Sequence, residues 1–438
     1  MKQKISTIHI VLFLIFFALG CSKREEVYIS PAKKISGGNI DTTQPIDTIS
    51  GAIKGSMKSG TIYYVINDIF INEGDTLYIP NNVTLYFLGD GKPNSSPSLF
   101  VRGTLISEGT KDKPNWFTIT DSNKLNFPNG GAWGGLTCDS AENVILRWTH
   151  IEYTGAPWGD YQTESASISS SHQAIICLSS FTNLVVEDSW VSHTQDDGIY
   201  VRNAKMAIMR NTIENVGATK GLPISIKFGA RGDIAYNVVI GGFNSGIKSQ
   251  SLSGAPSQSI VNVYNNTIIN CGFLNPDFTK GGGISFEKLV AGNAFNNLII
   301  QNKIGMRILG GASVADTANL KHGHNLYYGT TKDIVDNFFP TYTNFIATPQ
   351  MGDIYSTTPG ANDPKFKGLD VAKITDNNPR VQKGLDLHLQ SSSPAIGKGK
   401  TNIQNIPMKM VAPQTGAVIT PPNIDLGAYP TDGSGNQH

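Results

Sequence analysis

Charged residues are scarce in this 438-residue chain: Asp, Glu, Lys and Arg together make up only 16% of it, and the net charge is +1. A nucleic-acid-binding protein would carry a clear excess of basic residues. The composition therefore predicts that nucleic acid is not a partner. Glycine, in contrast, is abundant at 46 residues. Many glycines without charge-patterned helical stretches favour an all-β protein with many turns.

Cysteine is also rare, with four residues and no C-x-x-C pair. Zinc sites and disulfide frameworks need closely spaced or paired cysteines, so the sequence predicts neither. Apart from Cys21, three cysteines remain, Cys138, Cys177 and Cys271, and an odd number does not suggest a disulfide framework. We expect them to be small buried apolar residues.

Long hydrophobic runs are missing except at the N-terminus, where "ISTIHIVLFLIFFALG" follows the basic "MKQK" and ends just before Cys21. This run is short for a transmembrane helix, and a small residue before the cysteine is typical of a cleavage site. "FALGC" resembles the bacterial lipoprotein box, and the following "SKREE" resembles the export tag of surface lipoproteins of the Bacteroides group. The resemblance implies a lipoprotein signal peptide over 1–20, lipidation of Cys21, and an outer-membrane location with exposure at the cell surface. An ordinary secretory signal is the alternative.

Residues 21–50 are polar and rich in Ser, Thr, Pro and Gly, which predicts a flexible tether. The chain after it repeats one motif, an Asn followed by β-forming residues, as in "MRNTIENVG", "YNNTIINCG" and "FNNLIIQN". The repeated positions are 26 to 31 residues apart: Asn211, Asn237, Asn266, Asn297 and Asn325. Asp188 is expected to fill the same position in the preceding repeat. Each unit consists of strand, turn, strand, turn, and most units have no room for a helix.

A fixed period of this size built only from strands predicts a solenoid in which equivalent strands pair in parallel. Equivalent Asn side chains then stack at one corner and hydrogen-bond along the stack. The pattern resembles the single-stranded right-handed parallel β-helix, or pectate-lyase-like fold, of bacterial lipoproteins. A β-propeller is the rival, but its blades are longer and use hairpins. The resemblance implies an all-β fold with N-terminal capping strands over 51–430, an irregular C-terminal cap from about 340, and a disordered tail over 431–438.

One set of short strands can be aligned by phase, because side chains alternate between the two faces of a strand. The alignment places apolar residues inward in one column: Ile175, Ile199, Ile224, Ile247, Ile284 and Met306. It places these residues outward on one face: Tyr200, Arg202, Lys227, Lys248, Gln250, Glu287 and Arg307. Arg202 and Lys227 would be neighbours, and like charges directly opposed are unfavourable. Asp197, Glu287 or an anionic ligand is expected to offset them.

Two adjacent carboxylates, Asp196 and Asp197, lie in the turn before one of these strands, "GIYVR". They resemble the paired aspartates of the polygalacturonase family, in which carboxyl groups protonate the leaving oxygen and activate water. The other motifs of that family, "NTD", "GHG" and "RIK", are not matched here. Two further interpretations stay open: a Ca²⁺ site formed by Asp196 and Asp197, or a polar turn, because Asp and Gly favour turns.

A lyase would need a base close to a uronate and a cation that neutralises its carboxylate. If the protein is an enzyme, the lyase is favoured over the hydrolase, with Lys227, Arg202 and Asp197 as the catalytic candidates. The loop 156–173 carries Trp158 and Tyr161, which suit stacking on sugar rings. The candidate substrate-binding residues are Trp158, Tyr161, His193, Tyr200, Lys248, Glu287 and Arg307.

These patterns predict a monomeric, lipid-anchored protein that binds or processes an extended, acidic polysaccharide along one face of a β-helix. A polar, elongated face suits an extended sugar chain, and its basic residues suit uronate or sulfate groups. The alternative is a non-catalytic structural or adhesive β-helix protein, because this type of fold serves many unrelated functions. No cofactor is predicted firmly; Ca²⁺ is the one candidate.

Overall fold

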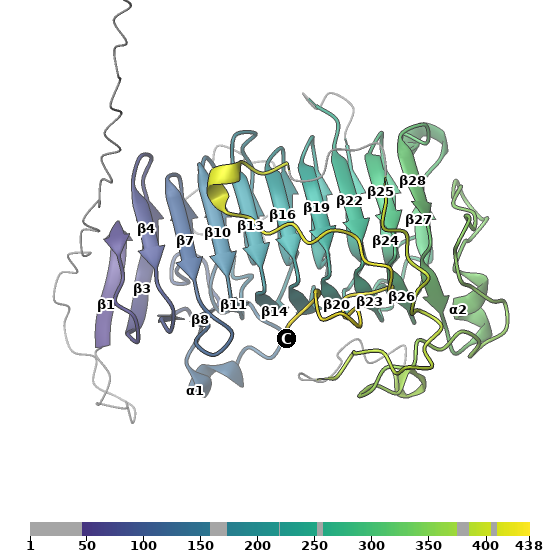
Figure 1. The fold of residues 1–438 in the computed structure, drawn as a ribbon. Helices are drawn as coiled ribbons and strands as arrows, with labels where there is room; N and C mark the ends of the chain where they lie inside the picture. The colour runs from purple at the N-terminus through teal and green to yellow at the C-terminus, as the bar shows by residue number, and fades with distance from the viewer. Residues whose placement is uncertain (1–45, 158–172, 219, 252–256, 375–384, 404–409) are drawn as a thin grey trace, which may run out of the picture.

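The computed structural model describes residues 46–157, 173–218, 220–251, 257–374, 385–403 and 410–438. The chain winds into a parallel β-helix with three faces of strands along the length of the molecule, here called the first, second and third sheets (Figure 1); hydrogen bonds through β3 (Ile62–Ile71) join the second and third into one sheet. Strands of successive coils pair in parallel within each sheet. The all-β solenoid expected from the repeat is therefore confirmed, although a coil such as the one over residues 183–202 has three strands and not the expected two.

The first sheet has ten strands. They are β2 (Gly55–Ser56), β4 (Thr76–Ile79), β7 (Thr104–Glu108), β10 (Asn143–Arg147), β13 (Asn183–Glu187), β16 (Lys205–Met209), β19 (Arg231–Ala235), β22 (Ile260–Tyr264), β25 (Ala291–Phe295) and β28 (Leu320–Gly323). The second sheet comprises β5 (Thr84–Phe87), β8 (Asn115–Thr118), β11 (Thr149–Glu152), β14 (Trp190–Thr194), β17 (Thr212–Val216), β20 (Val238–Ile240), β23 (Thr267–Ile269), β26 (Leu298–Ile300) and β29 (Leu326–Tyr328).

The third sheet comprises β6 (Leu99–Val101), β9 (Leu136–Cys138), β12 (Ile175–Cys177), β15 (Ile199–Arg202), β18 (Ile224–Lys227), β21 (Ser245–Gln250), β24 (Gly282–Glu287) and β27 (Met306–Ile308). Two long N-terminal strands, β1 (Ile46–Ala52) and β3 (Ile62–Ile71), join the second and third sheets, since β3 pairs with both β5 and β6. Strand β1 pairs with β3 from Ile46 onward, so the β-helix begins inside the segment expected to be a tether, 21–50.

The hydrophobic core fills the inside of the coils. The column predicted to point inward, from Ile175 to Met306, is buried and in register throughout the third sheet. Cys138, Cys177 and Cys271 are buried free thiols, as expected. β-Branched and other apolar residues stack in the same phase on every coil, and this burial is the main driving force for the fold.

A ladder of Asn side chains connects successive coils where the first sheet turns into the second. Asn211 Nδ2 donates to Asn237 Oδ1 at 2.9 Å, and Asn237 Nδ2 donates to Asn266 Oδ1 at 2.9 Å. The ladder continues through Asn297 to Asn325 with spacings of 3.0 and 2.9 Å. Each amide also donates to a backbone carbonyl, so these buried turns keep their polar groups paired.

The assignment of Asp188 to this ladder is wrong. Strand pairing places Glu187 beside Met209, so that Ser189 is the residue level with Asn211. The Ser189 backbone N–H donates to Asn211 Oδ1 at 2.9 Å. Asp188 instead points away and forms an ion pair with Arg210 at 2.8 Å. The register of the preceding strand, not the likeness of Asp to Asn, decides which residue enters the ladder.

Helix α2 (Lys332–Asp336) closes the C-terminal end of the core, opposite β1 (Figure 1). Its Ile334 and Val335, together with Phe338, join the main apolar cluster. A covered end leaves no strand edge open for pairing with another chain. The only other α-helix in the described ranges is α1 (Asp121–Lys124), and single 3₁₀ turns occur at Gly311–Ser313, Val371–Lys373 and Pro413–Thr415. No helix in these ranges is both long and apolar enough to cross a membrane.

Residues 385–403 and 410–438, here called the C-terminal tail, run back along the molecule instead of stopping at its end (Figure 1). Arg147 of β10 donates to the Thr415 carbonyl at 2.7 Å, and Asn296, after β25, donates to the Asn423 carbonyl at 3.0 Å. The tail packs apolar residues against the first and second sheets. It therefore covers much of the outer face of two of the three sheets.

The last residues, 431–438, were expected to be disordered, whereas the structure packs them on the β-helix. Asn436 donates to the carbonyls of Asn211 and Tyr236 at 3.0 and 3.2 Å. The ring of His438 lies 5.6 Å from that of Trp190, edge to face. The polar composition of this segment suggested disorder, but its amide groups pair with the backbone of the coils.

Candidate functional site

The third sheet presents a charged outer surface, here called the cationic face, formed by β15, β18, β21, β24 and β27. Strand pairing places Arg202 beside Lys227 and Lys248 beside Ser285, as the phase alignment predicted. Ser285 is in turn beside Arg307. The side chains predicted to share one face therefore do so, over four rung spacings or about 19 Å.

Glu287 is the centre of a buried charge cluster on this face. Its Oε1 accepts from Lys248 Nζ at 3.1 Å and also pairs with the Arg307 guanidinium. Arg307 donates to Ser285 Oγ at 2.8 Å as well. Burial by itself would raise the pKa of Glu287, but the two cations hold that pKa below its usual value. Burial lowers the pKa of Lys248, against the opposing effect of Glu287.

Arg202 and Lys227 are half-buried and rest on aromatic rings. The Arg202 guanidinium lies 4.2 Å from the centre of the Phe228 ring, and Lys227 Nζ lies 4.8 Å from that of Tyr200. In the part of the chain that the structure describes, neither cation has a carboxylate within 4 Å. Asp197 offsets Lys227 only at longer range, through a charge interaction that opposes the rise in the pKa of that carboxyl, and Glu287 does not pair with either cation. Aromatic rings hold both cations in place.

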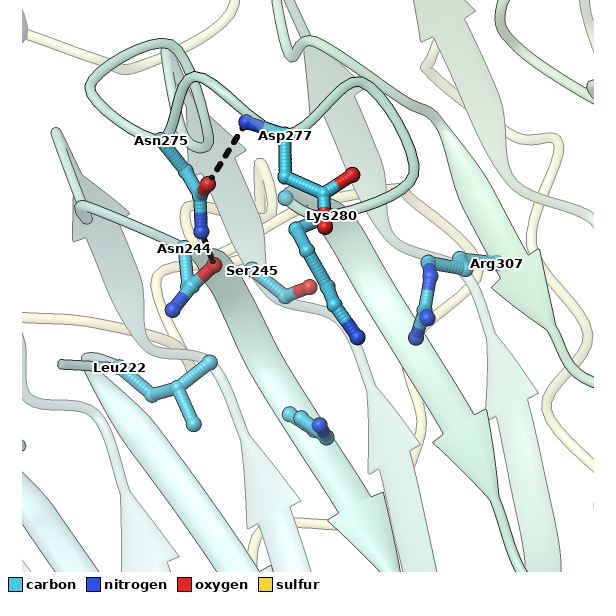
Figure 2. A pocket seen from close by; sticks show the side chains of 9 residues that line it. Leu222, Asn244, Ser245, Asn275, Asp277, Lys280 and Arg307 are labelled. Atoms are coloured by element: carbon cyan, nitrogen blue, oxygen red, sulfur yellow. Dashed lines mark hydrogen bonds between the residues drawn. The ribbon is translucent and has the colours of Figure 1, made fainter. Parts of the chain in front are cut away.

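A cavity of about 300 Å³ opens on the cationic face (Figure 2). Its lining comprises Leu222, Asn244, Ser245, Lys248, Asn275, Asp277, Lys280, Gly281 and Arg307. Lys280 descends from a loop toward the sheet, between Ser245 and Arg307 (Figure 2). Three cationic side chains, two side-chain amides and the single carboxylate of Asp277 line it, so positive charge exceeds negative charge in the lining, which suits an oxygen-rich anion.

The loop 272–281 forms one wall of the cavity. Gly272 and Gly281 make its neck: both have positive φ, and a Cβ on Gly281 would lie 2.7 Å from the Gly272 Cα. Lys303 Nζ donates to the carbonyls of Asn275 and Asp277 at 2.6 and 2.8 Å. The loop is therefore fixed at its neck and near its tip.

The loop also carries an exposed aromatic residue that is not part of the cavity lining. Phe278 is 64% exposed, and its ring lies 5.6 Å from that of Tyr342. Tyr342 donates to the Phe278 carbonyl at 3.3 Å, which holds the loop from the other side. An exposed aromatic ring close to a polar cavity is suited to stacking on a sugar.

Asp196 and Asp197 lie at the same edge of the third sheet but are buried, each only 5% exposed. Asp196 forms an ion pair with Lys220 at 3.5 Å and accepts from Gln173 at 3.4 Å. Asp197 accepts from the Leu222 backbone N–H at 2.7 Å, and Leu222 lines the cavity. Asp197 thus supports the wall of the cavity from the neighbouring coil, whereas Lys220 and Gln173, which contact Asp196, are not part of the lining.

Burial and the charge of Asp196 raise the pKa of Asp197 to about 6, although Lys227 and hydrogen bonds from Leu222 and Ser225 oppose this shift. Perturbed carboxyl groups cluster at functional sites. In the described ranges, Asp196 and Asp197 have no third His, Cys, Asp or Glu side chain placed to complete a metal site with them. Among the described residues, no group of three or more such side chains could hold an ion. Calcium binding by Asp196 and Asp197 remains a prediction.

The change Asp197→Asn is expected to stabilise the protein at pH 7 but not at pH 4. An unfolded Asp has a pKa near 3.9, whereas Asp197 in the fold has a pKa of about 6. Between these values the native state keeps a proton that the unfolded state has lost, so stability falls as pH rises through the window. Removing this group should restore about 2–3 kcal/mol at pH 7.

Thermal melting of both proteins at pH 4 and pH 7 measures this effect. An equal shift at both pH values would contradict it. Calcium provides the second comparison: if Asp197 holds Ca²⁺, then adding Ca²⁺ should raise the melting temperature of the wild type at pH 7 and leave that of Asp197→Asn unchanged.

Three other candidates differ in position. The ring of His193 stacks on that of Tyr153 at 4.8 Å, at the end of β14, and is not part of the cavity lining. Trp158 and Tyr161 lie outside the described residues. Residues that the sequence did not single out are Asn244, Asn275 and Lys280. The one signal was the length of the polar "GFLNPDFTKGGG" segment between two strands.

Comparison with known proteins agrees with the fold. Residues 150–339 match a family model described as "Right handed beta helix region". A solved structure, "Crystal structure of pectate lyase Pel9A", is similar with 12% sequence identity and a TM-score of 0.37, covering 82% of this chain and 88% of that chain. No curated protein matches. The pairing of the strands and the family match together identify the fold as an all-β, right-handed parallel β-helix.

Proposed function

We propose that the protein binds an acidic polysaccharide on the cationic face. The observation that carries the proposal is the presence of three cations, Arg202, Lys227 and Lys280, that have no carboxylate within 4 Å among the described residues. Lys227 interacts with Asp197, and Lys280 with Asp277, only at longer range, so that neither cation is held in a close ion pair and both stay available to a ligand. Such a surface attracts anions and would be relieved by a bound carboxylate or sulfate.

The shape of the face also supports a sugar ligand. The cavity volume of about 300 Å³ is at the lower end of the usual range for ligand sites, and its polar lining suits hydroxyl groups. The loop that forms one wall of the cavity also carries the exposed ring of Phe278. Since the tail covers much of the first and second sheets, the third sheet offers the polar surface for an extended molecule.

A lyase activity is the second candidate, and Lys248 is the observation that favours it. Its pKa is lowered by burial, and it lies in the cavity next to Arg307. In such a reaction a base takes the proton next to the uronate carboxylate, a C=C bond forms, and the glycosidic C–O bond breaks. Lys248 is better placed for this role than Lys227, because Lys227 does not line the cavity. The ion pair with Glu287, however, favours the protonated amine.

The proposal includes a lipid anchor at Cys21 and an outer-membrane location. The N-terminal residues that motivate it, 1–45, lie outside the described part of the chain. Membrane fractionation of Cys21→Ser tests the anchor: the variant should appear in the soluble fraction, and a variant that stays in the membrane fraction would refute lipidation.

Binding to immobilised polygalacturonate and chondroitin sulfate tests the function. The double change Lys227→Ala, Lys280→Ala should weaken binding at least tenfold, since each hydrogen bond to a charged group contributes about 1.5–3 kcal/mol. Binding by the wild type should also fall as salt rises. The matched control removes two exposed lysines of the first sheet, Lys205→Ala and Lys321→Ala, and should bind normally.

Incubation of the wild type with either polymer tests the lyase activity. Unsaturated products, which absorb in the ultraviolet, would show that the protein cleaves the polymer as well as binding it. If the wild type bound neither polymer and no other acidic glycan of a wider panel, the polysaccharide proposal would be wrong. The non-catalytic structural or adhesive alternative would then be preferred.

A further inference from the structure

We propose that the site recognises the end of an acidic sugar chain and seats its terminal residue in the cavity. This inference rests on the proposed function and makes it more specific. An extended groove would hold an internal stretch of a polymer, with chain leaving at both sides. The cationic face instead is closed on one side of the cavity and continues on the other.

The closed side lies at β27. Arg307 is 4% exposed, because its Nε donates to the Thr279 carbonyl at 3.0 Å and its guanidinium lies 5.2 Å from the Phe345 ring. Glu287 is covered to the same degree. A polymer cannot pass over this rung without displacing the loop 272–281 and the segment around Phe345.

The wall is built as a fixed structure. Lys303 and Tyr342 hold the loop through three hydrogen bonds to its carbonyls. Asn275 donates to Asn244 Oδ1 at 2.6 Å, which ties the loop to the coil of β21. The loop is therefore held at several points along its length.

The other side of the cavity continues along the face. The side chain of Lys248, at the cavity floor, is 21% exposed. Lys227 and Arg202 follow at the level of β18 and β15 and are half-buried. From β21 to β15 these cations cover two rung spacings, about 10 Å. If the terminal sugar occupies the cavity, the sugars that follow it can lie beside Lys227 and Arg202, toward β15. On the other side, toward β27, the face of the described coils offers no such path.

Fragmentation of the polymer distinguishes end binding from internal binding. The full-length protein in detergent is titrated with polygalacturonate and with the same material hydrolysed to a tenfold lower mean length. Fragmentation raises the number of chain ends per gram tenfold and leaves the sugar unchanged. Half-saturation should then require about one tenth of the mass. An unchanged or higher required mass would overturn end recognition, whereas no binding of either sample would refute the proposed function itself.

Two variants locate the terminal residue. Lys280→Ala should weaken the binding of galacturonate monosaccharide and of longer fragments by a similar factor, at least fivefold, because every ligand places its end in the cavity. Arg202→Ala should weaken the binding of fragments of several sugar residues and leave the binding of the monosaccharide unaffected. If Arg202→Ala weakened the binding of the monosaccharide as much as Lys280→Ala does, the terminal residue would not occupy the cavity and the inference would be wrong.

Reduction of the chain's aldehyde end with borohydride shows which end of the chain enters the cavity. With the same fragments after reduction, a loss of binding indicates the reducing end, and full binding indicates the opposite end.

Discussion

Glu287→Gln is expected to destabilise the protein strongly and, at the same time, to strengthen its binding of acidic ligands. Glu287 is the carboxylate that two buried cations share, and its loss leaves Lys248 and Arg307 without a counter-charge. Breaking a buried pair in this way costs about 3–5 kcal/mol. The same change removes a negative charge beside the cavity, so an anionic ligand should bind several-fold more tightly.

The opposite signs of the two effects make this test specific. Glu108→Gln is the matched control, because Glu108 is 40% exposed in its ion pair with Arg147 and is expected to contribute less than about 1 kcal/mol. Denaturant unfolding gives the stability change, and titration with polygalacturonate gives the affinity. Weaker binding by a Glu287→Gln protein that is still folded would mean that Glu287 positions the cations for the ligand, and that its charge is not what opposes binding.

Asn266→Ala should cause the second large loss of stability. Asn266 Oδ1 accepts from the backbone N–H and side-chain amide of Asn237 at 3.0 and 2.9 Å, and its own amide donates to Asn297 and to the Ile234 carbonyl. Alanine satisfies none of these groups, and all of them are buried. At about 1–3 kcal/mol for each group left without a partner, a total of about 3 kcal/mol or more is expected.

The control for this change is Asn126→Ala, at an exposed position next to α1. Its side chain makes one long hydrogen bond, 3.5 Å to Asn123, so its loss should change stability by less than about 0.5 kcal/mol. Thermal and denaturant unfolding of the two variants side by side provide the measurement. Similar small shifts for both would show that the ladder contributes little.

Much of the fold could be predicted because its determinants recur along the chain. The Asn period fixes the coil length, and the inward column from Ile175 to Met306 fixes the register of the third sheet. Where a single coil departs from the pattern, prediction fails: Ser189, not Asp188, is level with Asn211. The Ser189 hydroxyl takes the place of the amide, because it accepts from the Thr149 backbone N–H and donates to the Glu187 carbonyl. A likeness between side chains is a weaker guide than strand register.

The site was predictable only in so far as it lies on strands. The phase of the strands placed Lys248, Glu287 and Arg307 on one face. It did not predict that Lys248 and Arg307 share the Glu287 carboxylate. Lys280 could not be predicted in this way, because it lies in a loop, where side chains do not alternate between two faces as they do along a strand. Its position follows from contacts made by Lys303, a residue 23 positions later in the sequence, with the loop. Only the folded chain brings these parts together.

The path of the C-terminal tail limits how the protein can change in evolution. Solenoids commonly lengthen by duplicating a coil, because each coil contacts only its neighbours. Here the tail meets several coils at set points, as at Arg147 with Thr415, Arg210 with Val418, and Asn296 with Asn423. A coil inserted between β13 and β25 would displace each later contact by about 4.8 Å unless the tail gained matching residues. The length of the tail therefore fixes the number of coils between those points.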